Sequence, residues 1–187
     1  MEFNNPSLLI KDLNFGKDAK SKIGAGVEKL AKAVKSTLGA SGKCVIYEDA
    51  RGIPVITKDG VTVAESVVLY DPVENLGATL IKEAAKNTVR EAGDGTTTAT
   101  VLAESLLNTI NLPEYKDSAD RVLREGVKSG LAKINNYLDS VKIDVTDDKL
   151  SHVASISCNN DIELGSIIAE AYNPVGKDGV VLMESSE

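Results

Sequence analysis

Apolar residues recur at three- and four-residue steps along most of this 187-residue chain, a spacing that is typical of amphipathic helices. In the longest run, Leu123, Val127 and Leu131 begin a stripe that Ile134 and Leu138 continue. These patterns predict helices over residues 18–38, 71–92, 96–110, 118–140, 147–156 and 161–172.

Two short runs at 44–47 and 55–57 have the residues of β-strands, and a loop containing glycine and proline separates them. They predict a β-hairpin, which is only marginally stable alone. We therefore expect it to pair with another element, such as another subunit. A further strand is expected at 179–183 and an edge strand at about 8–13. The predicted fold class is mainly α with small β hairpins (α+β).

Composition excludes several classes of protein. The formal net charge is −7, and no Lys/Arg cluster is interleaved with aromatic residues, which argues against a nucleic-acid binder. No apolar run approaches the roughly 20 residues that span a bilayer, so no membrane partner is expected. The first residues resemble neither a signal peptide nor a transit peptide, which predicts a cytoplasmic location. Cys44, Cys158 and the single histidine, His152, have no metal-ligand spacing and are interpreted as ordinary structural residues.

The stretch at 91–100, EAGDGTTTAT, lies between two predicted helices. Gly93 can end the first helix, and the residues after Asp94 can begin the second. A helix that starts at Gly95 and three threonines offers free amides, hydroxyls and a positive dipole end, which suit phosphate oxygens. The Asp94 carboxylate suits a Mg²⁺ that bridges phosphates, so the stretch predicts a metal–nucleotide site. The alternative is an ordinary helix start with an N-cap and a Thr-rich first turn.

Two other segments carry candidate phosphate chemistry. The sequence TLGASGK at 37–43 follows a predicted helix and can approach another group closely, although a simple glycine C-cap also explains it. Lys58 and Asp59 are adjacent at the end of a predicted strand. The ammonium would neutralise phosphate charge, while the carboxylate would orient and deprotonate a water. A solvated Asp-Gly turn is the alternative there.

The order of these motifs resembles the N-terminal part of the chaperonins, the ring-forming, ATP-driven folding machines. The phrases DGVTVAE and TTTATVL are similar to the bacterial and organellar 60-kDa type (group I) rather than to the archaeal and eukaryotic cytosolic type. The resemblance covers about residues 11–183. The motifs that carry it are TLG at 37–39, TKDGV at 57–61, GDGTTTAT at 93–100, SISCNND at 155–161 and VGKDG at 175–179.

The resemblance implies ATP and Mg²⁺ as cofactors and assigns roles to single residues. Asp94 would hold the metal, and Asp59 would be the catalytic residue that helps to orient the attacking water. Family members usually have proline and a basic residue where this chain has Ala40 and Ser41, and without the proline the loop is freer. The nucleotide-binding residues would be Thr37, Leu38, Gly39, Ala40, Lys58, Asp94, Gly95, Thr96, Thr97 and Thr98.

The resemblance also implies a domain organisation. Residues 1–140 would form the N-terminal half of the equatorial domain, which binds ATP and contacts the ring, and 141–187 the N-terminal half of the intermediate, hinge domain. The apical domain and the C-terminal halves would be absent. A second catalytic carboxylate and much of the adenine pocket would be missing with them.

The implied function is that of an ATP-dependent chaperonin subunit that assists protein folding and hydrolyses Mg-ATP in its equatorial domain. Its partners would be unfolded client proteins, bound through the absent apical domain, other subunits in a ring, and a co-chaperonin cap. The alternative is a truncated, non-catalytic module that docks on chaperonin rings or binds nucleotide without turnover. A degraded reading frame is a third possibility. Enzymatic activity stays open, because half of the implied site would be missing and 187 residues alone would then be inactive.

Overall fold

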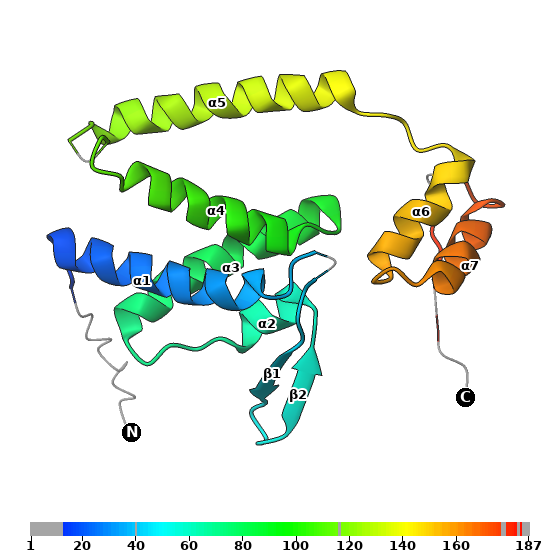
Figure 1. The fold of residues 1–187 in the computed structure, drawn as a ribbon, viewed down its shortest axis with the longest axis horizontal. Helices are drawn as coiled ribbons and strands as arrows, with labels where there is room; N and C mark the ends of the chain where they lie inside the picture. Colours follow the sequence, from blue (N-terminus) through cyan, green and yellow to red (C-terminus); the bar gives the residue numbers. More distant parts are fainter. Residues whose placement is uncertain (1–12, 40, 116, 177–178, 183, 185–187) are drawn as a thin grey trace, which may run out of the picture. The chain divides into compact units, whose positions relative to one another are not determined.

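A computed structural model describes residues 13–39, 41–115, 117–176, 179–182 and 184, and it is mainly helical (Figure 1). The chain divides into two compact units, Met1–Leu123 and Arg124–Glu187. None of the described helices is both long and apolar enough to cross a membrane. The elements are α1 (Gly16–Lys35), β1 (Val45–Glu48), β2 (Pro54–Thr57), α2 (Gly60–Ser66), α3 (Pro72–Ala92), α4 (Thr96–Ile110), α5 (Asp120–Val141), α6 (Asp147–Ser157) and α7 (Ile162–Tyr172).

The core of the first unit is aliphatic and is built around α1, which packs against α2, α3 and α4. The apolar positions of α1 recur at steps of three and four, so they share one face of the helix. Ala103 and Leu107 of α4 are partly buried against this core. Its buried residues are Val27, Leu30 and Val34 of α1, Val63 and Ala64 of α2, and Ala78 and Ile81 of α3.

The backbones of α1 and α3 approach closely at two glycines. A Cβ atom on Gly26 would lie 1.8 Å from the carbonyl oxygen of Glu74, and one on Gly77 would lie 2.2 Å from that of Ile23. Both distances are far shorter than a van der Waals contact, so each position excludes any side chain at this separation of the helices. The two glycines therefore set how deeply α1 packs onto α3.

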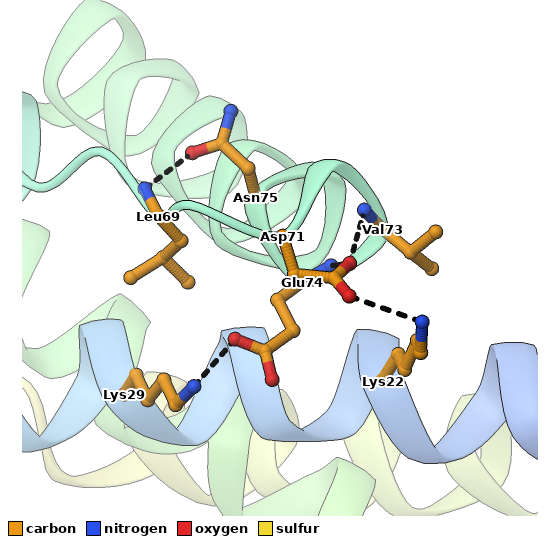
Figure 2. A network of polar contacts seen from close by, with 7 residues as sticks. All are labelled: Lys22, Lys29, Leu69, Asp71, Val73, Glu74 and Asn75. Carbon is orange, nitrogen blue, oxygen red and sulfur yellow. Dashed lines mark hydrogen bonds and ion pairs between the residues drawn. The ribbon is translucent and has the colours of Figure 1, made fainter.

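Two ion pairs join α1 to the first turn of α3 (Figure 2). Lys22 Nζ lies 3.0 Å from Asp71 Oδ2, and Lys29 Nζ lies 2.5 Å from Glu74 Oε2. Asp71 is also the N-cap of α3 and accepts from the backbone N–H groups of Val73 and Glu74. The hydrogen bond from Lys22 and these amide donors hold the pKa of the Asp71 carboxyl below its ordinary value. The cap that starts α3 thus also fixes its position against α1.

The predicted hairpin forms, and β1 pairs with β2 in antiparallel register, with Val45 opposite Thr57 and Ile46 opposite Ile56. Val45 packs against the core, whereas Ile46 and Ile56 are each 68% exposed. The expected pairing of this hairpin with another element stays a prediction.

In the second unit, α6 and α7 pack against each other. The contact is close at Gly165, where a Cβ would lie 2.2 Å from Ser155 Oγ. The turn between the helices contains Asn159 and Asn160, both in the left-handed region with φ of 59° and 66°. Asp161 then caps α7 by accepting from the Leu164 N–H at 2.9 Å. Helix α5 crosses the boundary between the two units, and none of its residues is buried.

The structure differs from the sequence-based expectations in four places. The strand expected at 179–183 is absent over Gly179–Leu182, because a strand requires a pairing partner and none is present among the described residues; Met183 lies outside them. Helix α1 ends at Lys35, three residues before the expected end. Helix α2 was not expected at all. Of the edge strand expected at about 8–13, only Leu13 is described, and it is not in a strand.

The glycine contact predicts opposite effects for two substitutions in α1. Gly26→Ala should lower the free energy of unfolding by about 1–3 kcal/mol, because the methyl group would push α1 away from the Glu74 carbonyl. Gly24→Ala should raise it by about 0.5–1 kcal/mol, since a Cβ there meets nothing within 4 Å and alanine favours the helix. Chemical denaturation measures both. Equal effects of the two substitutions would contradict the close approach.

Candidate functional site

The helix stop and helix start predicted around residue 94 both form. Gly93 ends α3 in the left-handed region with φ of 77°, and its N–H donates to the Val89 carbonyl at 2.8 Å. Gly95 is the N-cap of α4 with φ of 94°, and no side chain caps this helix. Asp94 lies between the two glycines, is exposed, and accepts from the Gly95 N–H at 2.6 Å. Asp94 is therefore not the N-cap that an ordinary Asp-initiated helix would have, and its carboxylate leaves the first amides of α4 uncovered.

The first turn of α4 divides its threonines between the core and solvent. Thr96 is buried and only 6% exposed, whereas Thr98 is exposed and Thr97 is half-buried. One turn further on, the hydroxyl of buried Thr100 donates to the Thr96 carbonyl at 2.9 Å. Of the three threonine hydroxyls predicted to contact phosphate, the Thr98 hydroxyl is thus the most open to a ligand.

Asp59 starts helix α2 and is more than a solvated turn residue. Its carboxylate accepts from the Val61 N–H at 3.3 Å, the Thr62 N–H at 2.8 Å and the Thr62 hydroxyl at 2.5 Å. Partial burial by itself would raise the pKa of Asp59, but the hydrogen bonds from Thr62 and Val61 outweigh it and hold the pKa below its ordinary value. The group is therefore a fixed, ionised acceptor at neutral pH. A low pKa favours orienting a water over taking a proton from it.

The start of α2 touches the start of α4. A Cβ on Gly60 would lie 2.2 Å from Thr97 Oγ1 and 3.5 Å from Val34 Cγ1, so a side chain there would displace the Thr97 hydroxyl. The segments TKDGV and GDGTTTAT, which are more than thirty residues apart in sequence, are thereby adjacent in space.

The loop after α1 folds back on the end of its own helix. The Thr37 hydroxyl donates to the Val34 carbonyl at 2.8 Å, and the Lys43 N–H donates to the Ser36 carbonyl at 2.7 Å. Gly39 has φ of 76° and accepts from the Gly42 N–H at 2.9 Å. Because Ser36 is the C-cap and has right-handed helical dihedrals, the glycine C-cap alternative does not describe this helix end.

The structure thus brings some of the predicted residues together. The Thr37 hydroxyl donates to the carbonyl of Val34, the side chain of Val34 lies beside Gly60, and Gly60 contacts Thr97. Leu38, Gly39 and Lys58 are exposed, and Ala40 lies outside the described residues. Gly60 itself was not a predicted site residue, although its place directly after Asp59 in a strand-to-helix turn is a signal for close approach.

A second feature missed by sequence reasoning is an ion pair between Lys35 and Glu104, which joins the last residue of α1 to α4. Glu104 is 6% exposed. The signal for it was the spacing of Thr96, Thr100 and Glu104 at four-residue steps, which places all three on one face of α4.

The groups around residue 94 suit Mg²⁺ only together with phosphate. Among the described residues no group of three or more His, Cys, Asp and Glu side chains could hold a metal ion. Mg²⁺ usually keeps several waters and is bound through one or two carboxylates together with substrate phosphates. A single exposed carboxylate beside uncapped helix amides fits that pattern, so Asp94 suits a magnesium–phosphate group rather than a metal held by protein alone.

Two hollows lie in the described part of the first unit. One, of about 450 Å³, lies between the hairpin and α2 and includes Tyr47 and Thr62. The other, of about 720 Å³, lies between α1 and the end of α4 and includes Lys20 and Asn111. Neither is lined by a predicted site residue.

Comparison with known proteins identifies the class. Residues 30–185 match the TCP-1/cpn60 chaperonin family, and the chain belongs to that family. Its fold is similar to the chaperonin gp146 from the bacteriophage EL 2 (Pseudomonas aeruginosa), solved in the presence of ATP-BeFx in two crystal forms. Crystal form II gives a TM-score of 0.75 at 31% identity over 88% of this chain, and crystal form I gives 0.73 at 32% identity over 85%. The chain spans only 29% and 28% of those two chains.

The expected chaperonin membership and the mainly helical fold, similar to the chaperonin equatorial domain, are therefore confirmed. The boundary expected near residue 140 stays a prediction. It falls at the end of α5, whereas the boundary between the two compact units lies between Leu123 and Arg124 in the sequence.

The contact between α2 and α4 predicts a coupled pair of substitutions. Gly60→Ala should lower the free energy of unfolding by about 1–3 kcal/mol, because its methyl group would overlap the Thr97 hydroxyl. Thr97→Ala removes that obstacle, so Gly60→Ala should cost less in the Thr97→Ala background. A double-mutant cycle by chemical denaturation measures this difference. Strict additivity would show that the two segments do not touch.

The cap of α2 predicts a pH effect. Because the folded-state pKa of Asp59 is lowered, its contribution to stability is complete above the unfolded pKa of about 3.9 and is lost as the pH falls through the folded pKa. Thr62→Val removes the hydroxyl donor, so the pKa of Asp59 should rise and this acid-dependent loss should shrink. Carboxyl NMR titration and denaturation between about pH 2 and 6 measure both.

The control for this experiment is Thr79→Val, which removes a hydroxyl that donates to the Asn75 carbonyl in α3 and has no carboxylate partner. It should leave the Asp59 titration unchanged. An unchanged titration in Thr62→Val would show that the hydroxyl bond does not set the pKa.

Proposed function

We propose that this chain binds Mg-ATP where α1, α2 and α4 meet and acts as part of an ATP-dependent chaperonin subunit that assists protein folding. The observation that carries the proposal is the contact of Gly60 with Thr97, next to the end of α1. It gathers three segments of phosphate-type chemistry within a chain of the chaperonin family. The similarity to a phage chaperonin solved with ATP-BeFx supports the choice of nucleotide.

The proposed roles follow from the exposure of each group. The amides of α4 that no side chain caps, together with the exposed Thr98 hydroxyl, would bind phosphate oxygens, and the helix dipole would favour the negative charge. Asp94 would hold Mg²⁺, which when bound supplies neutralising charge between the phosphates. Thr37, Leu38, Gly39 and Ala40 would border the phosphates from the loop after α1.

Lys58 and Asp59, directly before the first residue of α2, would act as a pair. Lys58 is exposed and would contribute positive charge toward phosphate. Asp59 would orient a water through the lone pairs that its three capping hydrogen bonds leave open. Its lowered pKa supports an orienting role in place of the proton abstraction that the sequence suggested.

In the proposed organisation, residues 1–140 belong to the equatorial domain and residues 141–187 to the intermediate domain. The proposed partners are other subunits in a ring, unfolded client proteins and a co-chaperonin cap, and the proposed location is the cytoplasm.

A second candidate function is a module that docks on chaperonin rings or binds nucleotide without turnover. The exposed Ile46 and Ile56 of the hairpin favour it, because they form an apolar pair in a sheet whose two strands pair with no third strand among the described residues. Two measurements on the chain separate the candidates: ATP hydrolysis supports the first, and association with complete chaperonin rings through the hairpin supports the second.

The metal role of Asp94 predicts a specific loss. Asp94→Asn should weaken Mg-ATP binding by on the order of tenfold to a hundredfold, because a charged ligand contributes about 1.5–3 kcal/mol. Nucleotide binding without Mg²⁺ should change much less. Calorimetric titration of Mg-ATP and of metal-free ATP measures both.

Glu91→Gln is the matched control, since Glu91 is another exposed acidic residue in the last turn of α3 and carries no proposed role. It should leave both affinities unchanged. If Asp94→Asn bound Mg-ATP as well as the unmodified chain does, the proposed site would be wrong.

A further inference from the structure

Helix α4 carries a buried carboxylate two turns beyond its proposed phosphate-binding amides. The side chain of Glu104 is 7% exposed and forms an ion pair with Lys35 Nζ, whose own side chain is 42% exposed. Removing a carboxylate from water is unfavourable unless it is paired, so Lys35 is what makes this buried charge tolerable. Because apolar residues of similar volume often give equal or greater stability, the pair is poorly explained as a device for stability alone.

The position of the pair links two of the proposed phosphate-binding segments. Lys35 is the last residue of α1, and the loop that carries Thr37 begins directly after it. Glu104 lies two turns along α4 from Thr96, on the same buried face. The ion pair therefore fixes the end of α1 against the inner face of the helix whose first turn offers its amides.

The third segment meets the same pair of elements. Gly60, at the start of α2, lies between Thr97 of α4 and Val34, the residue before Lys35. A shift of α1 along α4 would therefore change the distances among the end of α1, the start of α2 and the start of α4. These three helix ends border the proposed phosphate position.

We propose that Lys35 and Glu104 are positioning residues, which act through the loop after α1 and the first turn of α4 to hold the phosphate-binding groups in register. This inference rests on the proposed function. The pair touches no proposed ligand atom. The pair sets the distance between the loop after α1 and the first turn of α4, which do touch the proposed ligand. Residues outside a site can modulate affinity in this way, by fixing the elements that carry the site.

The test compares two ion pairs of α1 in the full chain. Glu104→Gln and Lys35→Gln each break the proposed positioning pair, and the double variant removes both charges. Glu74→Gln is the matched control, because the Lys29–Glu74 pair joins α1 to α3 and lies away from the loop. Mg-ATP affinity is measured calorimetrically below the melting temperature of every variant, and amide hydrogen exchange is followed at 36–39, 41–43 and 95–98.

Glu104→Gln and Lys35→Gln should each weaken Mg-ATP binding by about tenfold and speed exchange in both segments. The double variant should lose little more than either single one, because the two side chains act as a unit. Glu74→Gln should lower the melting temperature while leaving affinity and exchange there unchanged. Should Glu104→Gln fail to fold, Lys35→Gln, at the half-exposed end of the pair, carries the comparison.

Two affinity results would overturn the inference. One is an unchanged affinity in both single variants; the other is a loss in Glu74→Gln that matches theirs, since that would make affinity follow stability alone. If the unmodified chain binds no Mg-ATP, the proposed function fails instead. Hydrogen exchange then still decides whether the pair holds the two segments, and unchanged exchange would overturn the positioning role by itself.

Discussion

The close contact between α1 and α3 is the constraint on which the rest of the first unit depends. Gly26 and Gly77 allow each helix backbone to approach a carbonyl of the other, and this brings Val27, Leu30 and Val34 into the core. The Lys22–Asp71 and Lys29–Glu74 pairs lie along the same contact (Figure 2). Because α2 and α4 also pack on α1, its position determines where the proposed site residues lie.

Helix α2 is too short to be stable by itself, since isolated helices below about 12 residues are marginal in water. The structure fixes it at both ends. Asp59 caps its first turn, and Lys82 Nζ, reaching from α3, donates to the Val67 carbonyl at 2.5 Å just beyond its last turn. The orientation of Asp59 is therefore tied to the packing of α3, because a displacement of either end would release the other.

The sequence predicted the helices that carry their own boundary signals. Asp71 followed by Pro72 marks the start of α3, and Gly93 marks its end, so α3 and α4 form close to the expected bounds. Helix α2 escaped prediction because Val61, Thr62 and Val63 are β-branched and favour a strand locally. Its helical form depends on the Asp59 cap and on burial of Val63 and Ala64, which are tertiary effects.

The same limit applies to the candidate site. The motifs indicated which segments to consider, and their chemistry could be inferred from residue types alone. The contact of Gly60 with Thr97 and the ion pair of Lys35 with Glu104 could not be inferred, because each joins segments whose separation depends on how three helices pack. A hydrophobic pattern records which face is buried, but not which polar residues meet there.

Helix α4 shows why pattern alone misleads here. Its buried residues are the polar Thr96, Thr100 and Glu104, whereas Leu102 and Leu106, one turn apart, are 59% and 49% exposed. A helix that buries polar groups and exposes leucines is the reverse of an ordinary surface helix. Its inner face carries the hydrogen bond of Thr100 and the ion pair of Glu104, and the two exposed leucines lie on another face. Helix α4 therefore combines aliphatic packing, through Ala103 and Leu107, with polar contacts that join it to the end of α1 beside the proposed site.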